Sequence, residues 1–175
     1  MDFDKAKFKR LVHYVAWKAG KRDWFGAVKL NKVLWYADAR TYVLRGTSIT
    51  GETYVREKFG PVPRHIKQIC TEMEREGTLK VFKEGKLTRV VATEPPDANW
   101  FSREELQSIN YWIEHIDKEH TATSISDATH DYVWQQAKMY EELPLYAYRV
   151  LRIPEELRDE DLSRLKARAK ELGLI

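Results

Sequence analysis

The chain has a single cysteine, Cys70, among its 175 residues, and it has no long apolar run. One cysteine can form neither an intrachain disulfide nor a cysteine-based zinc cluster. Cys70 falls in an apolar helical stripe, so we interpret it as a small core residue rather than a nucleophile. No apolar run approaches the roughly 18 residues that a membrane span needs. The N-terminal MDFDKAKFKR lacks the apolar region of a signal peptide. We therefore expect a cytoplasmic protein.

Sequence motifs of catalysis and cofactor binding are missing as well. The sequence has no GxGxxG, GxxxxGK[ST] or HExxH pattern. His115 and His120 are five residues apart, which places them on different helix faces and does not favour a metal pair. His130 and Asp131 are neighbours, and neighbouring helical side chains point apart. We expect no cofactor, no metal and no catalytic residue. An enzyme would require these two side chains and a hydroxyl to converge in one cleft.

Charge is distributed unevenly along the chain. Residues 1–93 contain 20 Lys and Arg against 10 Asp and Glu, a balance of +10. Residues 94–175 contain 10 against 17, a balance of −7, and the two give the net charge of +3. The basic half could meet nucleic acid or an acidic protein surface. Alternatively, the two halves attract each other and set the packing of the molecule.

The N-terminal half predicts three helices, over residues 3–19, 27–45 and 63–76. The second has the clearest periodicity, with an apolar stripe formed by Leu30, Val33, Leu34, Ala37, Thr41 and Leu44. A second stripe runs beside it and could be the edge of the core or a partner surface; it consists of Asn31, Trp35, Asp38, Tyr42 and Arg45. Gly60-Pro61-Val62-Pro63 interrupts the pattern, and its prolines argue against a strand or a helix there.

The remaining pattern predicts a small hairpin followed by helices. Residues 79–91 alternate around Gly85, as in a β-hairpin. Ser102 and Glu105 form a capping-box pattern at the start of a helix that reaches about residue 119. The predicted fold is mainly α (α+β), a multi-helix bundle with a hairpin after the third helix and a winged-helix-like N-terminal part. We expect a single domain over 1–150, with a basic half 1–93 and an acidic helical half 94–150. A C-terminal helical extension would occupy 151–175.

Three helices followed by a hairpin is the element order of a winged helix, which suggests DNA binding. The residues that would contact phosphates are Arg64, Lys67, Arg75, Lys83, Lys86 and Arg89. Glu72, Glu74 and Glu76 lie on the same helix and would repel a DNA backbone. A winged-helix-type DNA-binding transcriptional regulator, which could also regulate its own operon, is therefore the alternative function.

Four short motifs resemble one family. KLNKVLWYAD at 29–38 is similar to a Lys-Leu, Lys-Leu-Leu-Tyr-Phe-Ala helix, and GTSITG at 46–51 resembles a Gly-x-Pro-Leu-Thr/Ser stretch, with Ser48 in place of proline. KFGPVP at 58–63 carries a Gly-Pro-Val signature. ISDATHDYVWQQA at 125–137 is similar to a Leu-Ser-x-x-Thr-His motif followed by Trp. In this order, over about residues 7–140, the motifs resemble the Panacea, or SocA-like, antitoxin domain family, once known as a phage-associated family.

This resemblance implies a mainly helical domain that neutralises a partner toxin by direct contact, without a cofactor or an active site. The toxin would be encoded by a neighbouring gene, and DNA is a second possible partner. The motif residues would be architectural: Gly60, Pro61, Val62, His130 and Trp134. The candidate contacts for the toxin are the side chains expected to be exposed around the bent helix pair: Asn31, Trp35, Arg56, Lys58 and Arg64.

Overall fold

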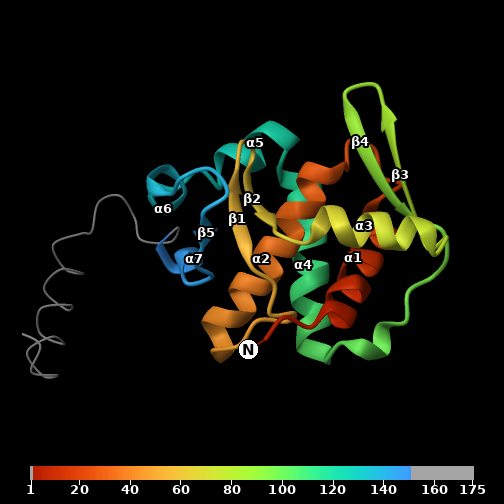
Figure 1. The fold of residues 1–175 in the computed structure, drawn as a ribbon, viewed down its shortest axis with the longest axis horizontal. Coiled ribbons are helices and arrows are strands. Elements are labelled where there is room, and N and C mark those ends of the chain that lie inside the picture. The colour runs from red at the N-terminus through yellow and green to blue at the C-terminus, as the bar shows by residue number, and fades with distance from the viewer. Residues whose placement is uncertain (1, 151–175) are drawn as a thin grey trace, which may run out of the picture.

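The computed structural model describes residues 2–150, which form helices packed around α2 and two small antiparallel sheets (Figure 1). The elements are α1 (Lys5–Ala19), α2 (Ala27–Arg45), β1 (Tyr54–Glu57), β2 (Gly60–Pro63), α3 (Ile66–Arg75), β3 (Leu79–Glu84), β4 (Leu87–Ala92), the 3-10 turn η1 (Ala98–Trp100), α4 (Arg103–Glu119), α5 (Ala122–Asp127), α6 (Tyr132–Gln136), β5 (Glu142–Leu143) and α7 (Ala147–Val150). The predicted mainly α (α+β) class is confirmed. The predicted helical extension over 151–175 lies outside the described residues.

Local signals place the helix ends. Asp4 caps α1, since its carboxylate accepts a hydrogen bond from the Lys7 amide at 2.8 Å. Helix α2 ends at Gly46, whose φ of +76° is the left-handed conformation that favours glycine. The predicted capping box of α4 is confirmed, with Ser102 and Glu105 each bonding the other's backbone amide. These ends follow from single residues, so the sequence was sufficient to predict them.

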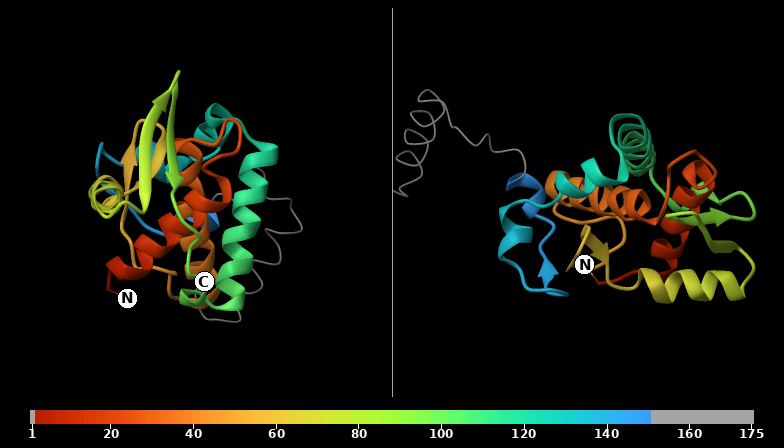
Figure 2. Two further views of the ribbon diagram at one scale, coloured as in Figure 1. Left: turned by 90° about the vertical axis from the view of Figure 1, so that its right-hand side faces the viewer. Right: turned by 90° about the horizontal axis from the view of Figure 1, so that it is seen from above.

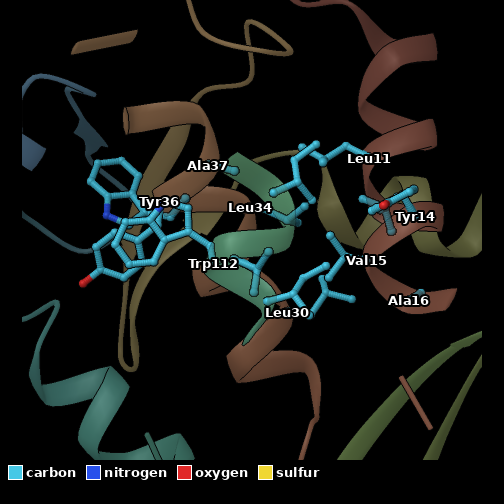
Figure 3. Close-up of a cluster of buried hydrophobic side chains, with 14 of the residues drawn as sticks. Leu11, Tyr14, Val15, Ala16, Leu30, Leu34, Tyr36, Ala37 and Trp112 are labelled. Carbon is cyan, nitrogen blue, oxygen red and sulfur yellow. The ribbon is translucent and has the colours of Figure 1, made fainter. Parts of the chain in front are cut away.

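Helix α2 lies at the centre of the molecule. It contacts α1, α4, α5, α7 and β2, which surround it on several sides. Figure 3 shows Leu30 and Leu34 of α2 beside Val15 of α1, with Tyr36 next to Trp112 of α4. The rings of Tyr36 and Trp112 stack with centroids 4.4 Å apart.

The second stripe of α2 is therefore buried at Trp35 and Asp38, and the expected exposure of Trp35 is wrong. Trp35 is only 1% exposed and packs edge-on against Tyr54, with ring centroids 5.1 Å apart. The reason is tertiary: the sheet formed by β2, β1 and β5 covers the face of α2 that α1 and α4 leave open. Tyr42, one turn from the end of the helix, keeps 36% of its surface exposed.

The prediction that Gly60–Pro63 cannot be a strand is also wrong. These residues form β2, the edge strand of the order β2-β1-β5, and pair antiparallel with β1. The Arg64 amide donates to Thr53 O at 2.9 Å, so the alternating Val62 and Gly60 amides also point toward β1. Both prolines then lie at positions whose missing N–H would face away from the sheet. Edge strands tolerate proline at such positions.

Helix α3 begins at Ile66, after the extended Pro63, and not at the predicted Pro63. The predicted hairpin is confirmed, with Leu79 opposite Ala92 and Glu84 opposite Leu87. Figure 2 shows this β3–β4 hairpin projecting beyond the helices, while α3 packs against β3 and α1 against β4. Along the chain, the β1–β2 hairpin lies between α2 and α3. The winged-helix arrangement and the division of the domain stay predictions.

Candidate partner-binding groove

Two of the motifs meet at Gly60. Its φ of +95° is unfavourable for residues with a side chain. A Cβ at this position would collide with Thr129 Oγ1 and lie 2.5 Å from Lys32 Nζ. Glycine is thus required because a helix α2 side chain and the α5–α6 connection both approach the backbone here. The Gly-Pro-Val turn and the Thr-His motif are parts of one packed cluster.

Lys32 of α2 supports the edge of β2. It is buried, and its Nζ donates a hydrogen bond to Pro61 O at 3.1 Å. The carbonyl of Pro61 faces away from β1, so the lysine satisfies an acceptor that the sheet leaves unpaired. No carboxylate within the described residues forms an ion pair with Lys32. Burial lowers the pKa of the ammonium group to about 7.

His130 and Trp134 form a second part of this cluster. Their rings stack with centroids 3.8 Å apart, and Trp134 Nε1 donates to Glu57 O at 3.2 Å. The Arg56 guanidinium lies 4.3 Å from the Trp134 ring centroid and donates to Ala137 O at 2.9 Å. These contacts fasten α6 to β1. They agree with an architectural role for the pair, and they engage Arg56 inside the fold.

A catalytic arrangement would need His130, Asp131 and a hydroxyl together. Ser126 Oγ lies 3.4 Å from His130 Nε2. The Asp131 carboxylate instead accepts the Trp134 amide at 2.7 Å, as the N-cap of α6. Burial, the largest cause, lowers the pKa of His130 and raises that of Asp131. The acid therefore caps a helix and does not orient the imidazole.

A groove opens beside this cluster, bounded by α2, β2, α3 and the β3–β4 hairpin. Its cavity of about 400 Å³ is in the size range of ligand pockets. The apolar lining includes Val28 and Leu30 of α2, Phe59 and Val62 at β2, Ile66 and Cys70 of α3, and Val81 and Val90 of the hairpin. In Figure 1, α3 runs across the front between the foot of the β1–β2 hairpin and that of the β3–β4 hairpin.

Two polar features of the groove are notable. Asn31 Oδ1 is buried and has no hydrogen-bond partner among residues 2–150, although a buried amide oxygen normally accepts one. Cys70 lines the groove and is partly buried, and burial raises the pKa of its thiol to about 11. The thiol is therefore protonated at neutral pH, in keeping with a packing role rather than a nucleophilic one.

The groove brings together residues from both sequence-derived sets. Asn31 and Lys67 line it directly. Lys58 Nζ lies 5.4 Å from the ring centroid of Phe59, a lining residue. Lys83 Nζ donates to Thr88 Oγ1 at 2.8 Å, and Thr88 is another lining residue.

Other candidate residues lie elsewhere. Arg64 is exposed and pairs with Glu142 at 2.8 Å. Arg75 and Lys86 are exposed. Arg89 is not exposed as a wing residue would be: its guanidinium donates to the carbonyls of Arg22 and Phe25 and pairs with Glu84.

Sequence reasoning missed the groove as a unit, together with its apolar wall. Val28, Val62 and Val81 lie on three elements separated in sequence, and each is only partly buried. In the sequence, the groove could have been suspected from Phe59, an aromatic residue that follows Lys58 in a turn. The packing of α2 against β2 and β4, and of α3 against β3, brings these walls together.

The fold and the site thus define a mixed α+β domain with an apolar groove on its surface. No group of three metal-ligating side chains and no helix able to cross a membrane occurs within residues 2–150. The chain belongs to the antitoxin SocA-like, Panacea domain family, whose model matches residues 30–135. Comparison with the curated proteins and comparison with the solved structures each gave no match. The family supports an antitoxin role.

Proposed function

We propose that this protein is an antitoxin that neutralises a toxin by binding it directly. The observation that carries the proposal is the family match over residues 30–135. The motif cluster supports it, because Lys32, Gly60, His130 and Trp134 are engaged with the protein's own backbone and rings. These residues stabilise a scaffold, which leaves the exposed side chains for partner recognition.

Among the candidate contacts, Lys58 and Arg64 are exposed and Asn31 lines the groove. We infer that these three belong to the toxin interface. Arg56 contributes indirectly by holding α6 in place, and Trp35 contributes as part of the core. No cofactor is required for neutralisation of this kind, since binding alone blocks the toxin.

Co-expression with the product of the neighbouring gene tests the proposal. We expect that product to stop growth when expressed alone, and this protein to restore growth and to co-purify with the toxin. The matched control carries an early stop codon in this gene, which keeps the transcript and removes the protein. A neighbouring product that is harmless, or a toxin that is neither bound nor neutralised, contradicts the proposal.

DNA binding is a second candidate, favoured by the exposed cations of α3 and the hairpin, among them Arg75 and Lys86. The acids of α3 are less of an obstacle than the sequence suggests, because Glu72 and Glu76 pair with Lys5 and Lys9 of α1. Fluorescence anisotropy on the DNA upstream of the gene, over a salt series, tests this function. We expect an affinity that falls steeply with salt and weakens further in Arg75→Ala/Lys86→Ala. Salt-independent or absent binding excludes it.

A further inference from the structure

The groove is an apolar surface that nothing in residues 2–150 covers. Phe59 keeps 54% of its surface exposed there, and the partly buried lining residues include Val28 of α2, Val62 of β2, Cys70 of α3 and Val81 of the β3–β4 hairpin. Large contiguous apolar surfaces on soluble domains commonly mark binding sites.

The edge of β2 limits how an occupant can bind. A peptide that extends a sheet needs alternating donors and acceptors on the edge strand. Pro61 and Pro63 hold the outward-facing positions and offer no N–H, and the Pro61 carbonyl is already bonded to Lys32 Nζ. An added strand would find no donors on these two residues. The groove therefore favours an occupant that inserts side chains, as an amphipathic helix does.

Charge around the groove favours an acidic occupant. Three exposed lysines surround it, Lys58, Lys67 and Lys83, and the side chain of Lys67 is 87% exposed. Two acids lie among the lining residues. Glu74 accepts the Val81 amide at 2.9 Å, and Glu57 lies 3.8 Å from Lys67. The exposed cations thus exceed the acids that could repel a negatively charged partner.

We propose that the groove binds an acidic amphipathic helix of the toxin, with its apolar face between α2, α3 and the hairpin and its carboxylates against the three lysines. This inference rests on the proposed antitoxin function and names the surface and the chemistry that it uses. The apolar side chains supply most of the affinity, and the lysines supply orientation and a faster encounter.

Paired variants test the surface. Thr71→Trp places a bulky ring in the groove from an exposed position of α3, and Gln68→Trp places the same ring on α3 outside the lining. We expect Thr71→Trp to weaken binding of the neighbouring gene product by about tenfold or more, and Gln68→Trp to change it by less than about twofold. Circular dichroism and thermal melting serve to check that both variants fold.

A second pair of variants tests whether binding requires the charges of the lysines. Lys67→Glu/Lys83→Glu reverses two of the three lysines. Lys80→Glu is the control, because Lys80 alternates with Val81 and so faces the other side of the hairpin. We expect the double variant to lose about tenfold or more in affinity at low salt, with the loss shrinking as salt rises, and the control to bind normally.

The single cysteine gives a direct readout. Cys70 lines the groove, so bound toxin should slow its reaction with N-ethylmaleimide, and the alkylated protein should bind poorly. Overlapping peptides that cover the toxin should reproduce the protection only where an acidic, helix-forming segment is present. If the toxin binds and is neutralised while Cys70 reactivity and the groove variants are unaffected, the groove assignment is wrong and the antitoxin function stands. If the toxin does not bind the wild-type protein, both fail. A protecting peptide that is basic also overturns the proposal.

Discussion

Lys32, Gly60 and Thr129 come from three of the family motifs and meet at one point of the fold. Lys32 takes up the carbonyl of Pro61, and Gly60 leaves room for its ammonium group. The lysine has no acidic partner within residues 2–150, and burial lowers its pKa to about 7. Two consequences can be measured. One follows from the charge of Lys32, and the other follows from the limited space at Gly60.

The first prediction concerns how the free energy of unfolding depends on pH in the wild-type protein and in Lys32→Met. With a folded pKa of about 7 against 10.5 when exposed, the unfolded chain binds more protons between these pH values. The free energy of unfolding should therefore rise from pH 7 to pH 10, by at most about 1.4 kcal/mol per pH unit from this group. Lys32→Met should remove that rise. Urea denaturation across the pH range measures it, and parallel curves for the two proteins would contradict it.

The second prediction is on Gly60→Ala. The new Cβ must adopt a left-handed φ and also displace Thr129 Oγ1 and Lys32 Nζ, so we expect a loss of about 2–4 kcal/mol. Gly77→Ala is the control, because Gly77 has a φ of +76° and nothing within 4 Å of its Cβ position. It should lose only about 1 kcal/mol. Equal losses in chemical denaturation would show that crowding at Gly60 is unimportant.

Among the elements, α2 organises its neighbours through Asp38. This carboxylate is fully buried and accepts four hydrogen bonds, from the Ile49 and Thr50 amides at 2.8 and 3.1 Å and from the Thr50 and Tyr54 hydroxyls at 2.7 and 2.8 Å. Burial raises its pKa to about 6, against the effect of those bonds. The contacts hold the segment after α2 in place and so position β1.

Asp38→Ala should therefore cost about 3–5 kcal/mol, because it leaves several buried donors without an acceptor. Asp38→Asn keeps one oxygen for the two amides, and its NH₂ group can donate to the two hydroxyls, so the loss should stay under about 1.5 kcal/mol. Hydrogen exchange at the Ile49 and Thr50 amides should speed up in the Ala variant first. Asp23→Ala, at an exposed position, is the control and should be nearly neutral.

The whole molecule explains the uneven charge of the sequence, at least in part. Several ion pairs join the basic half to the acidic half, as in the alternative that the two halves attract each other: Lys7 with Glu105, Arg22 with Glu114 and Asp117, Lys29 with Asp117, Arg45 with Glu104, and Arg64 with Glu142. The surplus lysines that remain exposed include those around the groove. The uneven charge therefore agrees with both alternatives, attraction between the two halves and a basic surface that meets a partner.

Arg22 tests the role of this attraction. It bridges α4 from the end of α1, with two carboxylates bound to one guanidinium, and these bonds raise its pKa despite partial burial. Arg22→Ala should lower the free energy of unfolding by about 1 kcal/mol at low salt, and by less in 1 M NaCl because the pairs are partly exposed. Lys21→Ala, at the neighbouring exposed position, should have little effect. A salt-independent loss for Arg22→Ala would mean that packing matters more than charge.

Periodicity, caps and glycines were enough to predict α1, α2, α4 and the β3–β4 hairpin, because each of these signals is local. The Gly-Pro-Val turn was recognised, but its strand was not, since a proline is acceptable only where the missing N–H faces away from the sheet. That depends on which strand lies beside it. The candidate contacts also gave mixed results. Lys58 and Arg64 are exposed as expected, whereas Trp35 is covered by a sheet that the local sequence pattern does not predict.

The sequence by itself determined the class of the fold, the family motifs and the charge of each half, because composition and short-range spacing carry that information. The tertiary structure alone decided that Lys32, Gly60 and Thr129 meet, that α2 is enclosed, and that α3 and two hairpins form a groove ringed by lysines. Burial and the neighbourhood of distant segments are properties of the packed chain. Whether a side chain belongs to the core or to a contact surface therefore depends on which distant segments pack around it.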